Sequence, residues 1–137
     1  MKQFFSANPL WQNMGLLMIR IITGAFLVYH GWEVFSAAKM DEYAQWNIFT
    51  SKSFTRTMVY AGKIAELIGG FLLIMGFFTR VACLIIIGTM GFIAFYIGHG
   101  KVWYDDQHPF LFVLLAFVFF FTGPGPISVD ATRNHQQ

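Results

Sequence analysis

The sequence predicts an all-α integral membrane protein, a four-helix bundle that runs up-down-up-down with both termini on the same side. The composition is 56% hydrophobic and 12% charged, whereas a soluble domain usually carries about 25% charged residues. Four apolar stretches come close to the roughly 20 residues that a helix needs to cross a bilayer. The 137 residues leave too little chain for a second domain, so we expect a single transmembrane domain over residues 1–137.

The four predicted spans cover residues 14–35, 58–78, 81–98 and 109–123. Because Thr79 and Arg80 form a very short turn, the second and third spans should be antiparallel neighbours. Pro109 begins the fourth span, where its missing N–H does no harm, and the Gly-Pro-Gly-Pro run at residues 123–126 ends it. A short surface helix is predicted over residues 43–49, in the polar loop before the second span.

The second span carries Lys63 and Glu66, two charges at depths where a bilayer normally tolerates none. On a helix, Gly62, Gly69 and Gly76 recur at i+7 and form one smooth stripe, and Glu66 lies about 40° from Gly62. Small residues let another helix approach closely. We therefore expect Glu66 to face protein and to pair with Lys63, its i, i+3 neighbour.

The order of the spans gathers the polar side chains at one end of the bundle. His30 and Glu33 end the first span, and Lys63 and Glu66 lie one to two turns inside the second span at that same end. His99, at the end of the third span, and His108, in the loop after it, are predicted there too. Arg20 and Arg80 fall at the opposite end.

This arrangement allows two interpretations of the charged residues in the spans. Ionisable residues inside a membrane usually have a function, so Glu66 and Lys63 are candidates for the centre of a proton-handling or ligand-binding pocket. They also fit a structural ion pair, completed by Arg20 or His30. Arg20 itself fits either an anionic ligand or a side chain that snorkels to the membrane surface.

The same residues also suit other ligands. His30 and Glu33, with His99, His108 and Asp105, are residue types that suit iron, zinc or manganese, but no tight ligand spacing supports them, so no metal is predicted. The tyrosines and tryptophans at this end fit an interfacial belt or a pocket for a flat ring such as a quinone. The net charge of +2 is spread out and suggests no nucleic-acid partner.

Several short motifs, taken in order, resemble the DoxX family of small four-helix membrane proteins. They are Arg20-(x3)-Gly24-(x5)-His30-Gly31, Gly62-(x3)-Glu66-(x2)-Gly69-Gly70, Gly76, Thr79-Arg80-(x)-Ala82 and Gly123-Pro124-Gly125-(x2)-Ser128-(x)-Asp130. The resemblance covers residues 14–130. It implies a multi-pass protein of the bacterial inner (plasma) membrane with cytoplasmic termini.

The resemblance also implies a role in redox chemistry, because some members of the family are subunits of a thiosulfate:quinone oxidoreductase and others assemble with oxidative-stress proteins. It carries over Arg20, His30, Gly31, Glu66 and Arg80 as site positions. Arg80 is also our candidate for a contact with lipid or an anion. Glu33 and Lys63 come from the charge pattern alone. After His-Gly the family often shows x-Gln-Lys, whereas residues 32–34 here are Trp-Glu-Val, so a role tied to that lysine is not carried over.

The leading functional hypothesis is an accessory subunit of a redox complex that binds a quinone headgroup or couples a proton to it. Glu66 is the expected proton acceptor, and Lys63, His30 and Arg20 pair with it or tune it. The alternatives are a small-solute or proton carrier and a structural scaffold without chemistry. The expected partners are the lipid bilayer and either further copies of this chain, as a homo-oligomer, or redox subunits.

Overall fold

The computed structural model describes residues 10–45 and 52–134, and every regular element in this part of the chain is helical. In order these are α1 (Gln12–Gly31), a 3₁₀ turn (Trp32–Phe35), α2 (Ala37–Ala44), α3 (Lys52–Met75), α4 (Thr79–Phe92), a π-helical turn (Ile93–Ile97), α5 (Gln107–Thr122) and α6 (Val129–Asn134). The predicted surface helix over residues 43–49 falls mostly outside the described residues, and the helix found beside it is α2.

Among the described residues, three helical stretches are long and apolar enough to cross a membrane: Gln12–Phe35, Phe54–Met75 and Thr79–Ile97. The fourth apolar helix, α5, has 16 residues and is shorter than the roughly 20 that a crossing normally needs. Many large apolar side chains on these helices are exposed, among them Phe121 at 75%. Such an apolar surface suits contact with lipid.

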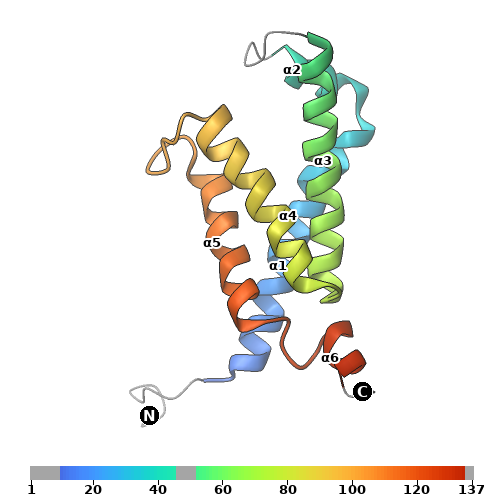
Figure 1. Ribbon diagram of the computed structural model, residues 1–137, viewed down its shortest axis with the longest axis vertical. Coiled ribbons are helices and arrows are strands. Elements are labelled where there is room, and N and C mark those ends of the chain that lie inside the picture. Colours follow the sequence, from blue (N-terminus) through green and yellow to red (C-terminus); the bar gives the residue numbers. More distant parts are fainter. Residues whose placement is uncertain (1–9, 46–51, 135–137) are drawn as a thin grey trace.

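The helices pack in chain order. α1 lies along α3, and α4 packs against both α3 and α5 (Figure 1). The core between them is apolar and consists of Leu27, Leu73, Cys83, Ile86, Met90, Phe112, Val113, Ala116 and Phe119. Cys83 is fully buried there as a free thiol.

Glycines bring α1 and α3 into close contact. A Cβ on Gly24 would lie 2.6 Å from the Cγ1 of Ile74 and 2.8 Å from the carbonyl oxygen of Gly70. The predicted stripe of Gly62, Gly69 and Gly76 does not pack against a single neighbouring helix. Within the described residues Gly62 faces open space, and Gly69 meets Ile86 of α4.

We expect Gly24→Ala to destabilise the fold by about 1–3 kcal/mol, because its Cβ would force the backbones of α1 and α3 apart. Gly88→Ala is the matched control, since no atom of a described residue lies within 4 Å of the position of its Cβ. There the higher helix propensity of alanine should leave stability equal or raise it by up to about 1 kcal/mol. Unfolding in mixed micelles measures both changes, and equal effects would contradict the close approach.

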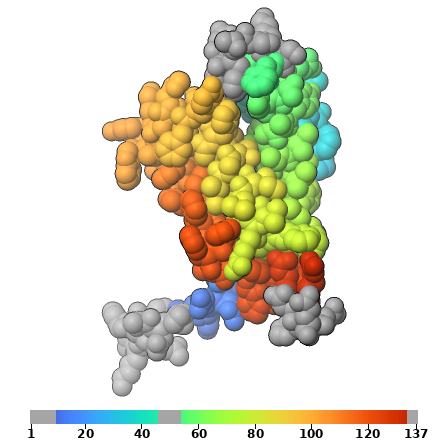
Figure 2. Space-filling view, viewed as in Figure 1, coloured from blue at the N-terminus to red at the C-terminus, as the bar shows by residue number. Residues whose placement is uncertain are grey.

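α6 lies against the turn between α3 and α4 (Figure 2). The Asp130 amide donates to the carbonyl oxygen of Gly76 at 2.9 Å. Gly76 has a φ of +62°, which glycine adopts without strain, and this conformation ends α3 three residues before the predicted position. The C-terminal segment is therefore tied to the same end of the bundle as this turn.

Candidate functional site

The ionic cluster comprises Glu33, Lys63 and Glu66, together with Tyr43. The Nζ of Lys63 lies 3.2 Å from the Oε2 of Glu66 and 2.9 Å from the Oε2 of Glu33. The Lys63 and Glu66 side chains are 13% and 4% exposed, so the predicted pair forms and faces protein. The 3₁₀ turn after α1 places Glu33 against α3, which gives Lys63 a second carboxylate.

Tyr43 joins the cluster from α2. Its hydroxyl donates to the Oε2 of Glu33 at 2.9 Å, and the Nζ of Lys63 lies 5.1 Å from the centre of its ring, within range of a cation–π contact. Burial is the largest cause that raises the pKa of Tyr43 to about 12, followed by the hydrogen bond to Glu33 and the negative charge of Glu33. The phenol therefore stays protonated at neutral pH and remains a donor.

His30 connects this cluster to α5. Its ring packs edge-on against the ring of His108, with 5.2 Å between their centres, and the charges of Lys63 and Glu33 both act on it. The ring of His108 in turn contacts Phe112, at 5.0 Å. His30 is thus in ring contact with His108 and within the electrostatic reach of Lys63 and Glu33.

His108 also lines a groove between α1 and α5, called here the α1–α5 groove, of about 380 Å³. Among the described residues that line the groove, Thr23 is the only other polar one. The apolar lining residues are Ile19, Ile22, Phe26, Leu111, Phe112 and Leu115. Its volume falls within the range of small-molecule pockets, which are mostly apolar with a few placed polar groups.

Arg20 lies away from the ionic cluster. Its side chain is 2% exposed, and its two terminal nitrogens donate to the carbonyl oxygens of Pro124 and Ile127, the latter at 2.7 Å. A Cβ on Gly76 would lie 2.8 Å from its Nη1. Since Gly76 follows Glu66 by ten residues, the two charges are separated by about 15 Å along the helix. The structure thus gives Lys63 a second partner in Glu33, and it gives Arg20 carbonyl partners.

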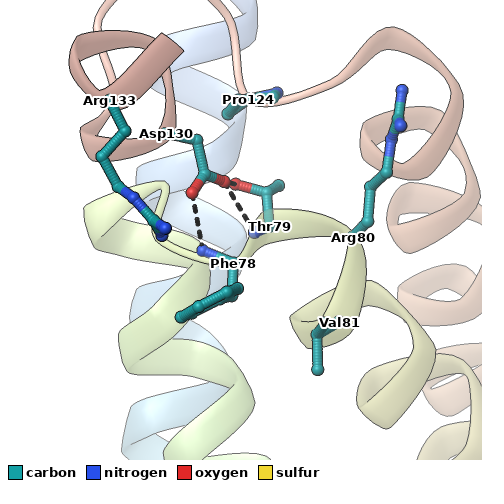
Figure 3. A pocket seen from close by; sticks show the side chains of 7 residues that line it. All are labelled: Phe78, Thr79, Arg80, Val81, Pro124, Asp130 and Arg133. Carbon is teal, nitrogen blue, oxygen red and sulfur yellow. Dashed lines mark hydrogen bonds between the residues drawn. The ribbon is translucent and has the colours of Figure 1, made fainter. Parts of the chain in front are cut away.

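Asp130 caps the start of α4. It accepts hydrogen bonds from the amides of Phe78 and Thr79 and from the Thr79 hydroxyl, each at 2.9 Å (Figure 3). Burial raises the pKa of Asp130, but the bonds from Thr79 and Phe78 and the charge of Arg133 outweigh it and leave this pKa lowered. The carboxylate is therefore charged at neutral pH. Arg80, in the first turn of α4, is exposed beside it.

Among the described residues, no group of three or more histidine, cysteine, aspartate or glutamate side chains could hold a metal ion. Tyr43 and Asp130 were missed as site residues by sequence reasoning. Tyr43 reaches Glu33 from the last turn of α2, back to the 3₁₀ turn before it, and no spacing rule predicts that contact. Asp130 was visible only as part of the C-terminal motif.

A family model described as DoxX matches residues 15–99. The matched segment includes Arg20, the ionic cluster and Arg80, and it ends before α5 and α6. His108 and Asp130 therefore lie outside it. No curated protein and no solved structure matches the chain.

Proposed function

Because the chain belongs to the DoxX family of membrane proteins, we propose that it is an accessory membrane subunit of a redox complex that binds a quinone. The α1–α5 groove would hold the ligand. The observation that carries the proposal is His108, which lines this apolar groove and also packs against His30 beside the ionic cluster. The groove and the cluster then act as one site.

The chemistry of a quinone suits this arrangement. Its isoprenoid tail is apolar and matches a groove lined by leucine, isoleucine and phenylalanine. Its ring carbonyl oxygens accept hydrogen bonds, which an imidazole N–H of His108 can donate. Full reduction of a quinone takes up two electrons and two protons. The electrons would come from a redox partner subunit, and the protons would pass by way of His108 and His30.

The ionic cluster would supply the proton store for this step. It holds one lysine and two glutamates, so with every group ionised its charge is −1. Excess negative charge inside apolar helices favours the uptake of a proton. Glu66 is the proposed acceptor because it is the more deeply buried carboxylate, and Lys63 holds its orientation.

The proposed setting is the bacterial inner membrane, with a single domain over residues 1–137 whose four helices run up-down-up-down. The arrangement of α1, α3, α4 and α5 in Figure 1 supports this topology. The hydrogen bonds of Arg20 to the segment after α5 support termini on one side, which we place in the cytoplasm. The short α5 would need a local thinning of the bilayer or a neighbouring subunit, and we propose that homo-oligomers or redox subunits provide one.

We expect the purified protein to bind a radiolabelled ubiquinone analogue with a short tail, and Leu111→Trp to weaken that binding at least tenfold. The larger side chain would fill the α1–α5 groove. Leu84→Trp is the matched control, because Leu84 is an exposed leucine on α4 outside the groove lining. Its affinity should equal that of the wild type. The proposal fails if the wild type does not bind or if both tryptophans act alike.

A further inference from the structure

Two arginines flank a pocket at the opposite end of the molecule from the ionic cluster. The pocket has a volume of about 370 Å³, and its lining includes Phe78, Arg80, Val81, Asp130 and Arg133. Arg80 comes from the first turn of α4 and Arg133 from α6. Figure 3 shows the two side chains on opposite sides of Asp130 and Thr79.

The charges around this pocket sum to a positive value. No salt bridge within the described ranges, 10–45 and 52–134, includes Arg80 or Arg133. The carboxylate of Asp130 interacts with Arg133 and also with Arg20, so its single negative charge offsets at most one of the two charges. Its oxygens already accept three hydrogen bonds from Phe78 and Thr79. One guanidinium charge therefore remains unbalanced at the pocket.

Backbone donors add to this charge. The first amides of a helix have no partner within the helix and carry a partial positive charge. Asp130 takes the amides of Phe78 and Thr79, and the Ala82 amide donates to the carbonyl oxygen of Phe78. Within residues 10–45 and 52–134, this leaves the amides of Arg80 and Val81 as the donors of the first turn. Amides and a guanidinium are the groups that bind phosphate oxygens in proteins.

The pocket also has an apolar rim where a membrane span begins. Phe78 and Val81 are 48% and 50% exposed, and the candidate span Thr79–Ile97 starts between them. The guanidinium of Arg133 lies over the rings of Phe77 and Phe78, at 5.8 Å and 5.1 Å from their centres. A ligand here would therefore meet positive charge on one side and apolar side chains on the other.

We propose that this pocket binds the phosphodiester group of an anionic phospholipid. Arg80 and Arg133 would hold the phosphate from two sides, and Phe78 and Val81 would contact the glycerol and the first carbons of the acyl chains. The site is separate from the α1–α5 groove and holds whether or not the groove binds a quinone. It would tie α4 and α6 together at the membrane surface.

Native mass spectrometry of the full chain tests this assignment, after reconstitution in nanodiscs of equal parts phosphatidylglycerol and phosphatidylcholine. The wild type should retain phosphatidylglycerol in preference to phosphatidylcholine. Arg80→Gln with Arg133→Gln should reduce that preference about 30-fold, since each arginine near an anionic surface contributes about fivefold. Both side chains are exposed, so the variant should keep its fold, and circular dichroism checks this.

Arg56→Gln is the matched control, because Arg56 is an exposed arginine on α3 that pairs with Asp41. Its lipid preference should equal that of the wild type. Equal retention of the two lipids by the wild type would overturn the proposal, and so would an equal loss in the control. A second arm adds inorganic phosphate at about 10 mM. If phosphate displaces the phosphatidylglycerol, the pocket is a soluble-anion site and the assignment to lipid is wrong.

Discussion

Replacement of Arg20 by methionine should lower the free energy of unfolding by about 3–5 kcal/mol. The change removes the charged donor of the carbonyl oxygens of Pro124 and Ile127, and each hydrogen bond to a charged group contributes about 1.5–3 kcal/mol. It also frees the segment that joins α5 to α6 from α1. Unfolding in mixed micelles, followed by circular dichroism, measures the loss.

Two variants accompany this measurement. Arg20→Lys keeps the charge but has no planar fork to reach two carbonyl oxygens, so it should lose an intermediate amount of stability. Arg56→Met removes an exposed arginine whose ion pair with Asp41 is worth about 0–1 kcal/mol. A loss for Arg20→Met no larger than that for Arg56→Met would show that the carbonyl contacts do not support the fold.

Lys63→Met should destabilise the protein by about 3–5 kcal/mol, because it leaves two carboxylates facing each other with no cation between them. The same change combined with Glu33→Gln and Glu66→Gln should recover most of that loss, since no uncompensated buried charge remains. The Tyr43 hydroxyl can still donate to the amide oxygen of a glutamine at residue 33. The same unfolding experiment compares the two variants.

The double variant Lys63→Met with Glu66→Gln tests whether Lys63 balances the charge of Glu66 alone or the charges of both Glu66 and Glu33. It should recover only part of the stability, because Glu33 would keep a charge at 25% exposure and, among the described residues, would retain Tyr43 alone as its donor. Full recovery in this double variant would mean that Glu33 contributes nothing to the balance of charge. Lys39→Met is the control, since its partner Glu42 is on the surface.

Much of the fold could be predicted, because composition and apolar length determine where membrane helices lie. Local sequence features explain why the observed ends of α3 differ from those of the predicted second span. α3 begins at Lys52, six residues before the predicted span, because polar residues continue a helix without adding to its apolar length. It ends at Met75 because Gly76 adopts a left-handed conformation, which no apolar pattern shows.

The candidate site was only partly predictable for a similar reason. Lys63 and Glu66 are three residues apart on one helix, so their pairing follows from helix geometry alone. The contacts of Glu33 with Lys63 and of Tyr43 with Glu33 depend on how the turn after α1 folds back on α3. The order of the spans correctly placed Arg20 at the opposite end of the bundle from Glu66. Its hydrogen-bond partners could not be predicted, because they are backbone carbonyls of an uncharged loop.

Photo-crosslinking with an azidoquinone in native-like membranes tests the central claim most directly, that the α1–α5 groove and the ionic cluster form one quinone site. Peptide mapping of the wild type should place the label on the segment around His108 and on α1 near Phe26. An excess of unlabelled quinone should prevent it. Label confined to the exposed faces of α3 and α4, or label that unlabelled quinone does not reduce, would contradict the account.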